Sequence, residues 1–299
     1  MRLLGLAAVA VFSVGIASAA QAVPAFTDLT TTTPEALANL LLAENSGITI
    51  NSVAYTGANV ASGSFTNGNS SNIGFDSGVA LTSGTLNTLP TSFNTNNVAL
   101  PNPALEEYNG GNPTFNASTL TIEFTPVGNE VSLLYVFGSN DYQFSVGTAF
   151  NDVFAAEVNG ENRALVPGTD LPVTINTVNC GDFAGNNAAN CDLFRDNRFG
   201  DITDLDLEGL TQIFELTASV TPGAINTLIL SIADSSDSFF DSVAFLQAGS
   251  FVSCGGPGLP ECDGGPGPGP EPVPEPGTIG LLGLAVLGAA ALRRSRRAQ

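Results

Sequence analysis

Short runs of alternating apolar and polar residues recur along the chain, and they constrain its fold more than any other feature. The pattern is clear at Leu120, Ile122 and Phe124. A period of two places every second side chain on one face of a strand, so each run predicts a half-buried strand. Further runs lie at residues 48–50, 53–55, 79–81, 131–137, 153–158, 173–178, 213–220, 225–232 and 243–246.

Turn-forming residues separate these runs. Asn159-Gly160 is typical of a hairpin, and Thr221-Pro222-Gly223 links two runs. The segments 56–74 and 84–117 are rich in Asn, Gly, Ser and Thr and are expected to be long surface loops. Roughly ten strands in about 230 residues favour a mainly β fold, a single antiparallel β-sandwich of the jelly-roll-like kind. A parallel β-helix is the alternative, but the sequence shows no short fixed repeat.

One short helix is expected before these strands. Thr33 suits the N-cap, Pro34 suits the first helical position, and Gly47 can end a run over residues 35–45. The leucines of this run would form its packing face.

The distribution of charge excludes several functions. The 299 residues include 28 acidic, 8 basic and no histidine residues, for a formal charge of −20. All 28 acidic residues but only three arginines lie within residues 23–276, so that segment carries −25. Binding to nucleic acid needs clustered basic residues and is excluded. The lack of histidine excludes Ser-His-Asp and Cys-His catalysis and histidine-ligated zinc or haem.

The N-terminal residues 1–22 have the layout of a secretory signal peptide. Arg2 precedes an apolar stretch over residues 3–16, and Ala-x-Ala occurs at 17–19 and again at 20–22. An uncleaved membrane anchor is the alternative.

The C-terminal end combines a short motif, an apolar stretch and a basic tail. Residues 277–292 contain no charge, and as a transmembrane helix they would span about 24 Å. The basic residues of the tail 293–299 would hold that end in the cytoplasm, with the rest of the chain outside. The motif is Val273, Pro274, Glu275 and Pro276, and the basic residues are Arg293, Arg294, Arg296 and Arg297.

This end resembles the PEP-CTERM sorting signal of Gram-negative bacteria. The resemblance implies recognition by an exosortase, cleavage in or beside the Pro-Glu-Pro motif, and association with exopolysaccharide-producing, biofilm-forming bacteria. An ordinary tail anchor is the alternative. Residues 254–276 are rich in proline and glycine and are expected to form an extended stalk that ends in the motif.

The four cysteines form two pairs that are close in the sequence, Cys180 with Cys191 and Cys254 with Cys262. An exported chain meets an oxidising compartment, so disulfides are expected. Three connectivities are possible, and the near-neighbour pairing is preferred. Zinc is disfavoured because neither spacing suits it.

A second resemblance covers most of residues 35–251. It is carried by the segments 73–84, 150–154, 165–169, 173–179 and 232–246, in that order. They resemble the choice-of-anchor L domain of bacterial surface proteins. The resemblance implies an exported, anchored β domain at residues 23–253, with no established activity.

Several oxygen-bearing side chains gather after predicted strands. Three carboxylates lie within eight residues after one run, and they repel one another unless they are protonated, separated or bridged by a cation. Calcium takes six to eight oxygen ligands, and the sequence predicts a structural calcium site here. Capping of turns by the same side chains is the alternative. The predicted ligands are Asp234, Asp237 and Asp241, with Asn151 and Asp152; Asp141 is a further oxygen-rich point.

A second acidic run, with Asp201, Asp204, Asp206 and Glu208, lacks EF-hand spacing and is expected to be a solvated edge. A glycosidase would need two carboxylates facing each other across a sugar in an aromatic-lined cleft. The chain has no tryptophan and four tyrosines, and its nineteen phenylalanines are expected in the core. Catalytic residues are therefore not assigned.

These features predict a non-enzymatic protein of the cell surface or extracellular matrix, exported and sorted through its tail. A carbohydrate-binding module is the alternative and predicts a concave sheet face with exposed Tyr, Phe and Asn. A carboxylate-based glycosidase is the third hypothesis.

Overall fold

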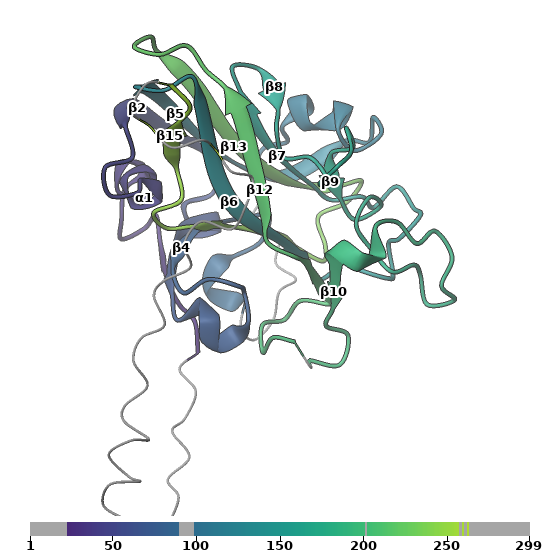
Figure 1. The fold of residues 1–299 in the computed structure, drawn as a ribbon. Coiled ribbons are helices and arrows are strands. Elements are labelled where there is room, and N and C mark those ends of the chain that lie inside the picture. The colour runs from purple at the N-terminus through teal and green to yellow at the C-terminus, as the bar shows by residue number, and fades with distance from the viewer. Residues whose placement is uncertain (1–22, 90–98, 201, 257–258, 260–261, 263–299) are drawn as a thin grey trace, which may run out of the picture.

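The computed structural model describes residues 23–89, 99–200, 202–256, 259 and 262. These residues fold into two antiparallel sheets with one α-helix, α1 (Pro34–Leu41), beside them (Figure 1). The prediction of a mainly β, sandwich-like fold with one short N-terminal helix is therefore confirmed. The jelly-roll-like strand order stays a prediction. No helix within the described residues is long and apolar enough to cross a membrane, and the helix expected at 277–292 lies outside them.

The larger sheet has nine strands within the described residues. Its central strand, β6, pairs with β14 and β15 along one edge and with β12 and β11 along the other. The strands are β1 (Ala25–Asp28), β3 (Ser62–Thr66), β4 (Gly78–Thr82), β6 (Glu130–Ser139), β10 (Phe194–Asp196), β11 (Gly209–Thr211), β12 (Phe214–Ser219), β14 (Ser242–Gln247) and β15 (Val252–Cys254).

The smaller sheet has six strands within the same residues, in the order β2-β5-β13-β7-β8, with β9 paired to β7. These strands are β2 (Ile48–Thr56), β5 (Thr114–Pro126), β7 (Val153–Val158), β8 (Glu161–Asn162), β9 (Val173–Thr174) and β13 (Asn226–Ser235). Five short 3-10 helices lie between the described strands: η1 (Asn59–Ala61), η2 (Gly68–Ser71), η3 (Leu86–Thr88), η4 (Pro103–Glu107) and η5 (Cys191–Leu193).

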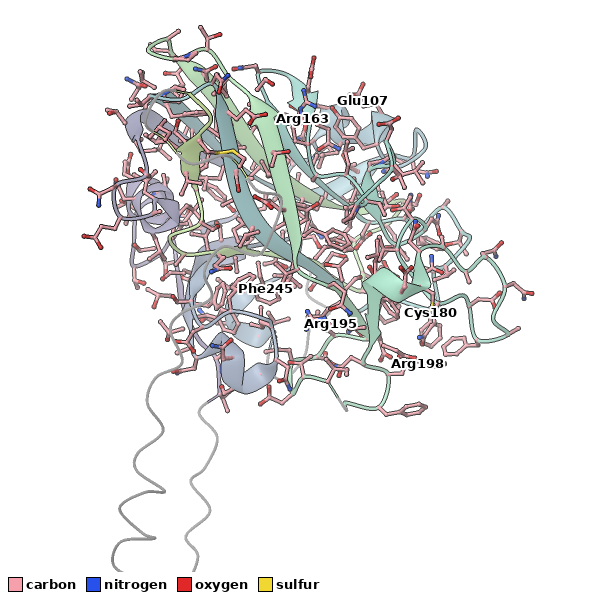
Figure 2. All side chains as sticks on the ribbon, in the orientation of Figure 1. Glu107, Arg163, Cys180, Arg195, Arg198 and Phe245 are labelled. Atoms are coloured by element: carbon pink, nitrogen blue, oxygen red, sulfur yellow. A yellow bond between two sulfur atoms is a disulfide. The ribbon has the colours of Figure 1, made fainter. Side chains whose placement is uncertain are left out.

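The main core lies between the sheets, and a second core covers the outer face of the larger sheet. In β14, Ala244 and Leu246 belong to the main core, whereas Val243 and Phe245 belong to the second. Figure 2 labels Phe245 within this part of the molecule. The strand is therefore buried on both faces rather than half-buried as expected, because its apolar residues are continuous instead of alternating.

The expectation that residues 56–74 form a long surface loop was wrong. This segment contains β3 and contributes Phe65 and Ile73 to the second core. The segment 84–117 likewise contributes Leu86 and Leu105 to buried clusters. Apolar residues are sparse there, so the period-two signal is weak although several of them are buried.

Other expectations were met or corrected at element boundaries. Thr33 caps α1, because its side-chain oxygen accepts a hydrogen bond from the amide of Ala36 at 3.2 Å. The helix ends at Leu41, not near Asn45, because Leu42 is extended and bridges to Phe251. Within the expected strand 173–178, only β9 is formed.

The two turn signals have different outcomes. Asn159 and Gly160 both have positive φ and join β7 to β8 in the expected hairpin. The turn at Thr221 instead joins β12 of the larger sheet to β13 of the smaller one.

Candidate functional site

Four aspartates gather at one end of the sandwich, where β6 and β13 end and β7 and β14 begin. Asp141 follows β6, Asp152 precedes β7, Asp234 lies near the end of β13, and Asp241 precedes β14. We refer to these four as the aspartate cluster. Each is at most 2% exposed. Two connections between the sheets therefore bring together carboxylates that lie far apart in the sequence.

Asp152 is held by groups from the second connection. Its Oδ2 accepts a hydrogen bond from the Ser242 hydroxyl at 2.6 Å, and its Oδ1 accepts one from the Ser235 amide at 2.9 Å. The Ser242 hydroxyl also lies 2.8 Å from that of Ser139. This network joins the ends of β6 and β13 to the starts of β7 and β14.

Asp234 is only partly satisfied. Its Oδ2 accepts a hydrogen bond from the side-chain amide of Asn116 at 3.0 Å, and the Ser83 side chain also hydrogen-bonds to this carboxyl. Its Oδ1 is buried and has no hydrogen-bond partner among the described residues. Such an oxygen has lost hydration without gaining a donor, which is unfavourable unless the carboxyl is protonated or a cation binds.

The remaining two members are positioned by small residues. Asp141 accepts a hydrogen bond from the Ser145 hydroxyl. The Asp241 carboxylate lies where a side chain on Gly84 would be, so Gly84 makes room for it.

Burial raises the pKa of each of three cluster members. The pKa of Asp141 is raised to about 7 by burial and by the charges of Asp237 and Asp241, against the lowering effect of Ser145. The pKa values of Asp152 and Asp234 are raised well above the ordinary range, first by burial and then by neighbouring carboxylates. The ion pairs found in the described residues, Arg163–Glu161 and Arg198–Asp196, involve none of the cluster. A bound proton or an external cation would neutralise it.

The structure brings together only part of the predicted calcium set. Asp152, Asp234 and Asp241 join the cluster. Asn151 instead binds the loop after β9, where its Oδ1 accepts a hydrogen bond from the Asn176 amide at 2.8 Å. Asp237 is half-buried and caps a turn by accepting from the Phe239 amide at 3.1 Å. Turn capping thus describes Asp237, whereas Asn151 joins backbone groups of two distant segments, at Asn109 and Asn176.

No group of three or more acidic or cysteine side chains among the described residues has an arrangement that holds a metal ion. Calcium binding stays a prediction. The aspartate cluster contains Asp141, which was only a further oxygen-rich point, and does not contain Asn151.

The second acidic run covers part of the outer core. Leu205 and Leu207 are buried, and Asp204 accepts a hydrogen bond from the Ser71 hydroxyl. Asp201 lies outside the described residues. The acidic side chains themselves fit the expected solvated edge, because Asp204 is exposed and Asp206 and Glu208 are half-buried, whereas the leucines between them are buried.

A pocket of 580 Å³ lies between the end of β2 and the segment before β5. None of its lining residues is ionisable; they are Thr56, Gly57, Ala58, Ala99, Leu100, Pro101, Asn102, Ala117 and Thr119.

The expectation that the phenylalanines form the core holds for only part of the set. Nine are buried in the described residues, but seven others are exposed: Phe115, Phe144, Phe150, Phe183, Phe199, Phe239 and Phe240. Most of the exposed ones lie in loops among Asn, Asp, Gly and Ser, outside any alternating run. That loop context was the signal that could have separated them from the core set.

Three of the exposed rings touch beside the aspartate cluster. The Phe144 ring meets that of Phe183 edge-on, with centroids 4.7 Å apart, and lies parallel to that of Phe240 at 6.1 Å. Their exposed fractions are 64%, 60% and 39%. We call Phe144, Phe183 and Phe240 the phenylalanine surface. Sequence reasoning missed it, because contact between three loops cannot be read from composition.

The preferred cysteine pairing is confirmed. Cys180–Cys191 closes the loop that carries Phe183, and Cys254–Cys262 joins the end of β15 to the residues that follow it. Figure 2 shows Cys180 toward the lower end of the molecule and Arg163 in its upper half.

Together these features define a disulfide-bonded antiparallel β domain with an acidic interior at one end. The chain belongs to the choice-of-anchor L domain family, whose model matches residues 25–252. A PEP-CTERM protein-sorting motif matches residues 272–297 and implies export to the cell surface and processing by an exosortase. Both expected resemblances are confirmed.

Other similarities are weak. No curated protein matches the sequence. Among solved structures, the crystal structure of a β-glucosidase from Kluyveromyces marxianus in complex with glucose is similar over 46% of this chain, at 12% identity and a TM-score of 0.20. The match spans only 10% of that chain, and it carries no argument about activity.

Proposed function

We propose that this protein is a non-enzymatic component of the cell surface or extracellular matrix, associated with exopolysaccharide. The observation that carries the proposal is the order of its two family matches: a β domain at 25–252, then a sorting motif at 272–297. In this arrangement the signal peptide at 1–22 starts export, and the membrane helix at 277–292 holds the chain while exosortase acts at residues 273–276.

The two disulfides support delivery to an oxidising compartment. Disulfides persist outside the cytoplasm and are rare within it. The described residues also contain no free cysteine, as expected of a domain that is oxidised once and then remains outside.

The placement of the carboxylates supports a non-enzymatic role. A glycosidase needs two carboxyl groups facing a sugar in an open cleft. Here Asp152 and Asp234 are buried and bonded to the protein itself, and no acidic residue is among the described residues that line the 580 Å³ pocket. The exposed phenylalanines favour the second candidate, a carbohydrate-binding module, although they lie on loops rather than on a concave sheet face.

The experiment that tests the proposal follows the tail in cells that contain an exosortase. Intact-mass analysis of the wild-type chain should show loss of residues beyond the motif, and protease treatment of whole cells should reach the domain. Glu275→Ala should retain the tail. Pro270→Ala, in the same proline-rich segment but outside the motif, is the matched control and should be processed normally. A wild-type chain that keeps its tail, or a domain that is protected inside the cell, would contradict the proposal.

A further inference from the structure

The phenylalanine surface is held in place before any ligand arrives. The Cys180–Cys191 disulfide closes the Phe183 loop, and Asp182 caps its turn by accepting hydrogen bonds from the amides of Ala184 and Asn186 at 2.8 and 2.9 Å. A surface fixed in this way loses little conformational entropy on binding.

The other two loops of the surface are bonded to the sandwich and to each other. The Gly147 amide donates to the Asn176 side chain at 2.6 Å, which fixes the Phe144 loop. The Ser236 hydroxyl donates to the Ala149 carbonyl at 2.8 Å, which joins the Phe144 and Phe240 loops. The three rings therefore keep their mutual arrangement.

Phe240 also adopts an unfavourable backbone conformation. Its φ is +58°, in the left-handed region that bulky residues rarely enter. Its side chain is 39% exposed, so burial in the core does not account for this conformation. Strained residues of this kind cluster at ligand-binding sites.

The charge around the rings selects the kind of ligand. Asp182 directly precedes Phe183 and, like an ordinary aspartate, is ionised at neutral pH. Hydrogen bonds, chiefly from Asn186, lower its pKa further. Asp237 lies three residues before Phe240. The segment 23–276 carries −25, so two copies of the domain repel each other and polyanions are disfavoured. Aromatic faces and carboxylates both attract cations.

We propose that the phenylalanine surface binds a polysaccharide whose sugars carry ammonium groups. The C–H faces of the sugars pack on Phe144, Phe183 and Phe240, and the ammonium groups pair with Asp182 and Asp237. The rings stand exposed on loops and do not line the 580 Å³ pocket, which suits an extended polymer better than an enclosed small molecule. This inference rests on the proposed matrix function and names the class of its ligand.

The test measures binding of the full chain, purified in mild detergent, to immobilised glucosamine oligomers and to N-acetylglucosamine oligomers of the same length. The charged oligomer should bind at least about tenfold more tightly, and added salt should weaken it. Phe144→Ala and Phe183→Ala should each weaken binding by about tenfold. Phe199→Ala is the matched control, because this exposed ring contacts Arg198 and should leave binding unchanged.

Three results would overturn the inference: equal binding of both oligomers, full binding by Phe144→Ala and Phe183→Ala, or equally tight binding of oligolysine. Thermal melting of each variant shows whether it is folded, and Phe240→Asn provides a second route, since it relieves the backbone strain while removing a ring. Loss of glycan binding with normal tail processing would overturn this inference alone. Failed processing in cells would overturn the proposed function and leave the binding result standing.

Discussion

At one end of the sandwich, Asn159 and Asn226 lie beside β7 and β13, whereas at the other end the same two strands meet Asp152 and Asp234. The Asn159 side chain donates to the Asn226 side chain at 2.9 Å and accepts from the Thr227 amide at 3.0 Å. Asn226 also accepts from the Thr221 amide at 3.0 Å and donates to its carbonyl. Donors and acceptors are matched at this amide end.

The aspartate end shows the opposite balance. Its carboxylates accept hydrogen bonds from serines and from Asn116, but they raise one another's pKa, and the Oδ1 of Asp234 has no donor among the described residues. The hydroxyl of Tyr142, whose pKa is raised by burial and then by Asp152, is also buried without a partner in that part of the chain. Neutral amide side chains carry both donors and acceptors, so the pair satisfies its own hydrogen bonds. Carboxylates only accept, so a group of them needs a proton or a cation from outside.

Among the polar side chains at the two ends, the largest expected effect comes from removing the most connected carboxylate. Asp152→Ala should lower the free energy of unfolding by about 3 kcal/mol, because the Ser242 hydroxyl and the Ser235 amide lose their buried acceptor. Asp152→Asn should lose less, since one oxygen remains. Urea denaturation of the three proteins measures the difference.

Asn226→Ala is the control at the amide end and should lose about 2 kcal/mol through its broken hydrogen bonds. A loss of under about 1 kcal/mol for Asp152→Ala would mean that relief of repulsion outweighs the lost hydrogen bonds. The contributions of the two ends to the free energy of unfolding would then differ less than proposed.

A smaller effect is expected from pH. Because the folded-state pKa values of Asp141, Asp152 and Asp234 are raised, the folded chain binds more protons than the unfolded chain. Their stabilising contribution is full below the unfolded pKa of about 4 and falls as pH rises through about 7. In the presence of a chelator, the free energy of unfolding should drop by about 1 to 3 kcal/mol between pH 5 and pH 8.

Calcium sharpens the same comparison. If it replaces the protons, millimolar calcium should restore about 1 to 3 kcal/mol at pH 8 and have little effect at pH 5. Asp234→Asn should abolish the calcium response, while Asn226→Ala should keep it. Stability that rises from pH 5 to pH 8 in chelator contradicts a protonated cluster, and an unchanged melting temperature with calcium at pH 8 contradicts the calcium site.

The smallest effect is expected on the phenylalanine surface. Phe183→Ala should change the free energy of unfolding by less than about 1 kcal/mol, because its ring is 60% exposed. Phe154→Ala should lose about 3 to 5 kcal/mol, because that ring is fully buried and packs against Tyr135 at 5.1 Å. Similar losses for the two variants in thermal melts would show that the surface is part of the core.

The strands that carry a strong period-two pattern could be predicted from the sequence, and β7 was placed at its observed bounds. The outer layer could not. Phe65 and Ile73 are single apolar residues in polar surroundings, and their burial depends on the outer face of the larger sheet, which no local pattern reveals. The role of Gly63 is likewise not visible in the local sequence: its lack of a side chain lets β3 approach the backbone of Thr27 closely.

Only the part of the site that lies within one sequence motif could be predicted. Asp234 and Asp241 were found because they lie close together in the sequence. Their meeting with Asp141 and Asp152 depends on β6 and β13 ending at the same end of the sandwich, which is a property of topology. Asp237 instead caps its own turn, and Asn151 bonds to distant backbone groups at Asn109 and Asn176, so neither belongs to the cluster.

The Cys254–Cys262 disulfide has a mechanical consequence. Any tension on the chain beyond Cys262 crosses the sulfur–sulfur bond to Cys254 and enters β15. That strand pairs with Glu130, Val131 and Ser132 of β6, the central strand of the larger sheet. The pulling force is therefore delivered to the middle of the fold.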